Sequence, residues 1–116
     1  MKKVFRIQRN CEFQFVYKRG KSVANPNMVI VFARNGNYTI KVGFSVSTKV
    51  GNSVVRNRVK RLMKENFRML LDRVKPGFHY VIIARKPIVK VTYHDVQRSL
   101  NYLLKKAKLL RTDEEG

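Results

Sequence analysis

One stretch of the chain restricts the fold more than any other, because its apolar residues follow the period of an α-helix. The stretch runs from Gly51 to Val74. Three- and four-residue spacing places seven apolar side chains on one side of a helix: Val55, Val59, Leu62, Met63, Phe67, Leu70 and Val74. Asn52 or Ser53 can cap the first turn. The fold must therefore contain a second layer against which this long helix buries one face.

The segments on either side of this helix have the composition of β-strands. Residues 28–34 and 38–45 are rich in β-branched and aromatic types, and the Asn35-Gly36 pair between them predicts an antiparallel hairpin. Residues 79–85 form a continuous apolar run, which is typical of a strand in the interior of a sheet. A shorter strand is expected around residues 21–24, before Pro26.

A short helix is expected near the N-terminus. Asn10 can cap it and Gly20 ends it. Its spacing places Phe13, Val16 and Tyr17 on one face and points Phe15 away from that face.

A closing helix is expected near the C-terminus. Thr92 and Asp95 have the spacing of a capping box. Apolar residues then line one face: Val96, Leu100, Leu103, Leu104, Ala107 and Leu110. The element order αβββαβα predicts an α+β fold in which helices pack on a central mixed sheet.

The charge of the chain indicates its class of partner. Lys and Arg total 26 and Asp and Glu total 7, for a formal net charge of +19. Three of the acids lie in the last four residues, so residues 1–112 carry 26 basic and 4 acidic side chains. Such a surface favours a polyanion, with nucleic acid ahead of an anionic membrane. We expect one RNA-binding domain over residues 1–112 and a disordered acidic tail over 113–116.

Several classes of protein are excluded by the composition. Cys11 is the single cysteine, so a disulfide framework and a cysteine-based zinc site are impossible. No apolar run reaches the length of a membrane span, and the polar residues of the first ten positions do not fit a signal peptide. We expect a cytoplasmic protein with no membrane partner and no small-molecule substrate.

A protein-borne active site is not visible in the sequence. A metal-dependent nuclease needs carboxylates or histidines that converge on a cation. The acids outside the tail are scattered over three predicted helices, and the two histidines stand alone: Glu12, Glu65, Asp72, Asp95, His79 and His94. We therefore predict no catalytic residue and no metal ligand in the protein.

The long helix carries a second pattern, on the side opposite its apolar stripe. Residues 49–68 contain seven basic side chains and one acid. A solvated helix face is one interpretation of this charge. Like charges four residues apart, as at Arg56, Lys60 and Lys64, each destabilise a helix by a few tenths of a kcal/mol, and alternating signs would serve solvation better. The pattern favours binding of a polyanion.

The run Gly51-Asn52-Ser53-Val54-Val55-Arg56-Asn57-Arg58-Val59-Lys60-Arg61, continued by Lys64-Glu65-Asn66-Phe67-Arg68, resembles the Arg-Asn-Arg signature helix of the bacterial ribonuclease P protein subunit. The similarity extends over the first helix, the predicted hairpin, the VIIARKP segment at 81–87 and the last helix. It therefore covers nearly the whole chain.

The resemblance implies a small protein that assists a catalytic RNA. In that family the holoenzyme removes the 5′ leader of precursor tRNA by endonucleolytic hydrolysis, and the RNA holds the catalytic magnesium ions. By position, the residues that would bind the catalytic RNA are Asn52, Arg56, Asn57, Arg58, Lys60, Arg61, Lys64 and Arg68. The expected partners are ribonuclease P RNA and precursor tRNA.

The family also binds the single-stranded leader in a cleft between the first helix and the sheet. Phe13 and Tyr17 match its aromatic positions, and Lys49, Arg85 and Lys86 match its basic positions. Aromatic rings suit a leader of variable sequence because every base has a face for stacking. For Phe13, a place in the core is an equal alternative. Thr48 and Val31 depart from the family pattern.

Two points remain open at this stage. A ribosomal or ribosome-assembly protein would also explain the charge and the α+β order, although not the signature helix.

The resemblance further implies that the strands before and after the long helix are joined by a left-handed crossover, an architecture shared with a domain of a small-subunit ribosomal protein. Pattern alone would favour a right-handed connection.

Overall fold

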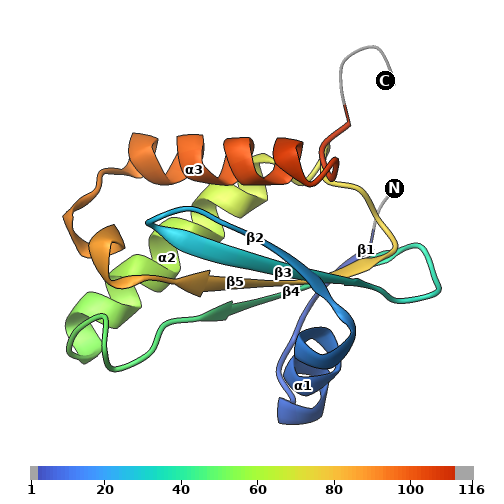
Figure 1. The fold of residues 1–116 in the computed structure, drawn as a ribbon, viewed down its shortest axis with the longest axis horizontal. Coiled ribbons are helices and arrows are strands. Elements are labelled where there is room, and N and C mark those ends of the chain that lie inside the picture. The colour runs from blue at the N-terminus through green and yellow to red at the C-terminus, as the bar shows by residue number, and fades with distance from the viewer. Residues whose placement is uncertain (1–2, 112–116) are drawn as a thin grey trace.

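The computed structural model describes residues 3–111 as one mixed sheet with helices on both faces (Figure 1). The elements in chain order are β1 (Lys3–Arg6), α1 (Asn10–Arg19), β2 (Lys21–Ala24), β3 (Met28–Arg34), β4 (Thr39–Ser45), α2 (Ser53–Met69), β5 (Phe78–Ala84), the 3₁₀ helix η1 (Lys86–Lys90) and α3 (Tyr93–Lys106). The expected tail at 113–116 lies outside the described residues. No helix within residues 3–111 is both long and apolar enough to cross a membrane.

The five strands lie in the order β1-β4-β5-β3-β2. β5 pairs in parallel with β4 and antiparallel with β3, so the sheet is mixed and β5 is its central strand. The predicted α+β class is confirmed. The first strand was not predicted, because two apolar residues between two basic ones give only a weak strand signal.

The predicted hairpin between residues 28–34 and 38–45 is wrong, because β5 lies between β3 and β4. The Asn35-Gly36 turn is present, and Gly36 has a positive φ of 78°. Gly77 enters between the two ends of this turn: Asn35 N donates to Gly77 O at 3.0 Å, and Gly77 N donates to Thr39 O at 2.8 Å. The apolar run of β5 requires a neighbour on each side, and this long-range requirement overrides the local turn signal.

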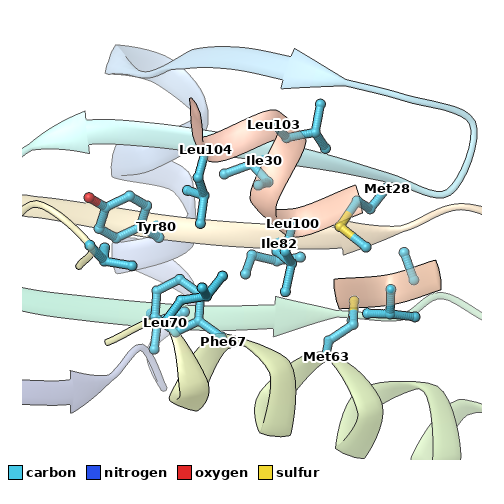
Figure 2. Packing of buried hydrophobic residues seen from close by; sticks show 14 of the residues in the cluster. Met28, Ile30, Met63, Phe67, Leu70, Tyr80, Ile82, Leu100, Leu103 and Leu104 are labelled. Atoms are coloured by element: carbon cyan, nitrogen blue, oxygen red, sulfur yellow. The ribbon is translucent and has the colours of Figure 1, made fainter. Parts of the chain in front are cut away.

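The main core lies between the sheet and the pair α2 and α3. Figure 2 shows Met63 and Phe67 of α2 and Leu100 of α3 directed toward the inward residues of the strands. Tyr80 of β5 is fully buried, its ring centroid is 5.8 Å from that of Phe67, and its hydroxyl donates to Lys75 O at 2.6 Å. Burial raises the pKa of Tyr80 above its ordinary value.

A smaller core lies under α1 on the other face of the sheet. Val16 is fully buried there against Val31 and Val81. Phe15 packs against the same cluster and makes an edge contact with the His79 ring, so the prediction that it points away is wrong. Gly20 ends the helix, as predicted, and a Cβ at this position would lie 2.4 Å from Val16 O.

The helix boundaries follow the capping residues. Asn52 Oδ1 accepts a hydrogen bond from Val55 N at 3.0 Å, and Thr92 and Asp95 form the predicted capping box. Asn10 is the first residue of α1 and Arg9 is its N-cap, so the predicted cap is wrong by one position. α2 ends at Met69 rather than at residue 74.

β4 and β5 are parallel neighbours, and α2 lies in the connection between them. This is the crossover unit that the resemblance implies. The left-handed sense of this crossover stays a prediction.

The insertion of β5 can be tested with two glycines. Gly36→Ala meets no atom within 4 Å and should destabilise the fold by about 1 kcal/mol through its positive φ alone. Gly77→Ala has φ of 89° and would also place its Cβ 3.0 Å from Asn37 O, so we expect a loss of about 2 kcal/mol. Urea unfolding measures both values. Equal losses would contradict the tight approach of residue 77 to the turn.

Candidate RNA-binding surfaces

α2 presents the predicted cationic ridge, defined as Arg56, Asn57, Lys60, Arg61, Lys64 and Arg68. The opposite side of the helix is buried in the main core through Val59, Met63 and Phe67. Asn57, Arg61 and Arg68 are exposed, whereas Arg56, Lys60 and Lys64 are half-buried. The predicted division of the helix into an apolar side and a cationic side is confirmed.

Two of the predicted contact residues also hold the fold together. Arg58 is exposed, but its Nη2 donates to Val89 O at 3.0 Å, which ties α2 to η1. Asn52 is exposed and caps α2 through its side-chain oxygen. Each keeps other donors free for a phosphate, since guanidinium has five N–H groups and the amide has two.

A groove of about 290 Å³ joins the ridge to α1. Lys60 and Lys64 line it from α2, Phe13 lines it from α1, and Arg6 lines it from the end of β1. Burial lowers the pKa of Lys64, with smaller contributions from the charges of Arg6 and Lys60. Three cations therefore share one partly desolvated site, in which an anion would be held more strongly than in open solvent.

Sequence reasoning did not identify Arg6. Its position depends on β1, which pairs with the edge of β4 and was not predicted. Ile7 N continues this pairing with a 3.0 Å hydrogen bond to Val42 O before the chain leaves the sheet for α1. The positive residues of MKKVFRIQR were a visible signal, but no pattern in them indicated proximity to α2.

Phe13 is half-buried, and its ring both packs against the sheet and borders the groove. Its ring packs over Gly43, where an added Cβ would lie 2.8 Å from a ring carbon. The same ring lines the groove. Tyr17 lies on the same side of α1, with a ring centroid 6.4 Å from that of Phe13, and 40% of the residue is exposed.

The predicted basic residues of the leader cleft lie at the carboxyl ends of β4 and β5. Lys49 follows β4, and Arg85 and Lys86 follow β5, and all three are exposed. Arg85 Nη1 donates to Asn25 O at 3.1 Å, which fixes its guanidinium at this end of the sheet. None of the three lines the groove with Phe13.

The titratable residues near α1 make contacts that stabilise the fold. Lys41 Nζ donates to Glu12 Oε2, and this hydrogen bond lowers the pKa of Glu12. Burial and the neighbouring charge of Lys41 lower the pKa of His79, which keeps its imidazole neutral near pH 7. Within residues 3–111, no three His, Cys, Asp or Glu side chains lie together as metal ligands would. The surfaces described above can bind anions and stack bases.

Comparison with known proteins identifies relatives along nearly the whole chain. The family model of ribonuclease P matches residues 1–108. The ribonuclease P protein component of Listeria welshimeri is 43% identical over 112 residues, which cover 96% of this chain and 94% of the relative. That of an Exiguobacterium species is 48% identical over 109 residues, covering 94% of this chain and 95% of the relative.

Solved structures show the same similarity. The RNase P protein of Staphylococcus aureus superposes with a TM-score of 0.84 at 38% identity, covering 91% of this chain and 97% of that one. The RNase P protein of Thermotoga maritima has a TM-score of 0.80 at 32% identity, covering 87% of this chain and 96% of that one.

Proposed function

The chain belongs to the ribonuclease P protein family and is a subunit of a tRNA-processing ribonuclease, and we propose that it acts by binding two RNAs at once. The catalytic RNA of ribonuclease P docks on the cationic ridge, and the single-stranded leader of precursor tRNA binds beside α1. The holoenzyme then removes the leader in the cytoplasm. The matched relatives are ribonuclease P protein components rather than ribosomal proteins, which favours this function over the ribosomal alternative.

The cationic ridge is the observation that carries the proposal. Its buried opposite face fixes α2 on the sheet, so the charged side chains are held on a rigid support. Arg56, Arg58 and Arg61 can each grip a phosphate with two parallel donors, while lysine acts as a point charge. The proposed contacts with the catalytic RNA are Asn52, Arg56, Asn57, Arg58, Lys60, Arg61, Lys64 and Arg68.

The leader is proposed to stack on Tyr17 and Phe13. Tyr17 offers the more exposed ring, and Phe13 offers the part of its ring that faces the groove. Three basic residues at the carboxyl ends of β4 and β5 would hold leader phosphates: Lys49, Arg85 and Lys86. Because Lys60 and Lys64 reach the same groove as Phe13, the two RNAs would lie next to each other there.

We assign the catalytic magnesium ions to the RNA. Glu12 is engaged by Lys41, and Asp95 is engaged by Thr92 and Arg98. These carboxylates lie on different helices and do not form the oxygen cage that magnesium requires. The role of the protein is then to bring two polyanions together and to neutralise their phosphates, which lowers the concentration of free magnesium that the RNA needs.

The function is tested by cleavage of precursor tRNA at low magnesium. We expect the catalytic RNA with the protein to cleave faster than the RNA alone, and the protein alone to be inactive. If the protein gives no acceleration, its proposed role fails. Cleavage by the protein without RNA would revive a protein-borne active site.

The ridge is tested by replacing two of its arginines. Arg56→Ala with Arg61→Ala should weaken binding to the catalytic RNA and reduce the slope of log K against log salt by roughly one for each phosphate that is no longer neutralised. Binding titrations over a range of KCl concentrations measure this slope. The control is a double variant, Arg98→Ala with Lys105→Ala. It removes the same charge from exposed positions on α3 and should leave the slope nearly unchanged. An unchanged slope in the ridge variant would mean that the ridge faces solvent.

The leader site is tested at Tyr17. Tyr17→Ala should weaken holoenzyme binding of precursor tRNA by about 1 to 3 kcal/mol, because one base no longer has a ring to stack on. Mature tRNA, which has no leader, should bind as before. Tyr17→Phe keeps the ring and serves as the control. Equal weakening for the two tRNAs would remove the leader from this position.

A further inference from the structure

A second concave surface takes no part in the function proposed above. It is a pocket of about 820 Å³ at the end of the sheet where β3 ends and β5 begins, the end opposite Arg85 and Lys86. The segments that follow α2 and α3 close its other sides. We call it the end pocket.

The end pocket concentrates positive charge from separate parts of the chain. Its cationic lining residues are Arg19, Lys21, Arg34, Lys75 and Lys108. No acidic side chain is present among the described residues that line it. Five like charges around one cavity repel each other in the free protein, and a bound anion would relieve that repulsion.

Lys108 holds its place in the end pocket at a conformational cost. It is the residue after the C-cap of α3, and its φ is +61°, a left-handed value that usually belongs to glycine. Leu109 N donates to Leu104 O at 2.8 Å, which is the hydrogen bond of a helix end of this type. Glycine would terminate α3 with less strain, but it would remove an ammonium group from the pocket.

Tyr38 supplies an exposed aromatic ring at the same site. It lies in the loop between β3 and β4 and is 74% exposed. The neighbouring ring of Phe78 is already covered by the Arg34 guanidinium, 5.3 Å from its centroid. A ring beside a group of cations is the combination that binds an unpaired nucleotide, with the base on the ring and the phosphate on the cations.

We propose that the end pocket is a second docking site for the catalytic RNA and binds an unpaired nucleotide of that RNA. This inference rests on the proposed function. Lys75 lies six residues beyond the end of α2, and Phe78 packs against the same core as α2 and α3, whereas α1 covers the other face of the sheet. The pocket therefore borders the layer formed by α2 and α3, although Arg19 at the end of α1 also lines it, and we assign it to the RNA that binds α2.

The test uses Lys75→Ala with Lys108→Gly and the cognate catalytic RNA. Binding should weaken by about tenfold and the salt slope should fall by about 1.4, since each of the two phosphate contacts with a single strand contributes roughly 0.7. The melting temperature of the protein should not fall on account of Lys108→Gly, because glycine adopts the positive φ without strain. Lys105→Ala with Lys106→Ala removes two lysines from the last turn of α3, outside the pocket lining, and should change the slope far less.

The outcomes separate the pocket from the ridge. If the pocket variant binds like the unchanged protein while Arg56→Ala with Arg61→Ala binds weakly, the pocket proposal fails and the proposed function stands. Equal weakening in the pocket variant and its lysine control would also overturn the pocket. Failure of the unchanged protein to bind the catalytic RNA would overturn both proposals. Weakening confined to precursor tRNA would assign the pocket to the leader and overturn its assignment to the catalytic RNA.

Tyr38 gives an independent readout. Tyr38→Ala should weaken binding of the catalytic RNA by about tenfold with an unchanged salt slope, because a stacked base releases no counterion. Tyr38→Phe should bind like the unchanged protein. Full affinity in Tyr38→Ala would show that no base rests on this ring and would overturn the single-nucleotide assignment.

Discussion

The central position of β5 is the constraint on which the rest of the molecule depends. Its residues alternate between the two cores, with Tyr80 and Ile82 facing α2 and α3, and Val81 facing α1. A strand that is apolar on both faces needs a neighbour on each edge and a covering layer on each side. β3 and β4 supply the neighbours, and the helices supply the layers. The insertion of β5 then brings the turn at Gly36 and the segment after α2 together at one end of the sheet, where the end pocket lies.

The same core offsets the electrostatic repulsion along α2. Like charges at i and i+4 along the ridge oppose the helix by a few tenths of a kcal/mol each. Val59, Met63 and Phe67 are buried on the other side, and burial of each such side chain contributes about 1.5 to 3 kcal/mol. Packing therefore exceeds the repulsion several-fold. The ridge can stay cationic for a polyanion without its own acidic partners.

Local patterns predicted what local interactions determine. The stripe of α2, its cap at Asn52, the capping box at Thr92 and the interior character of residues 79–85 are all set by residues within a few positions of each other. The hairpin was wrong because strand pairing is decided across the whole chain, and a turn signal at Asn35-Gly36 cannot exclude a third strand. Arg6 and the end pocket were missed for the same reason, since each depends on segments that are distant in sequence.

The distribution of cations follows from where the layers end. Basic side chains are excluded from both cores, so they lie at the edges of the layers. They are found along the outer side of α2, in the groove where β1 leaves β4, and around the end pocket. At the last two places the chain turns away from the sheet, so side chains from several elements converge on one hollow. In the groove Lys64 is partly buried, and desolvation together with the charges of Arg6 and Lys60 lowers its pKa. Phosphate is the ligand that reverses this effect, since a nearby negative charge restores the protonated form. A phosphate bound in the groove would therefore relieve the repulsion among Arg6, Lys60 and Lys64.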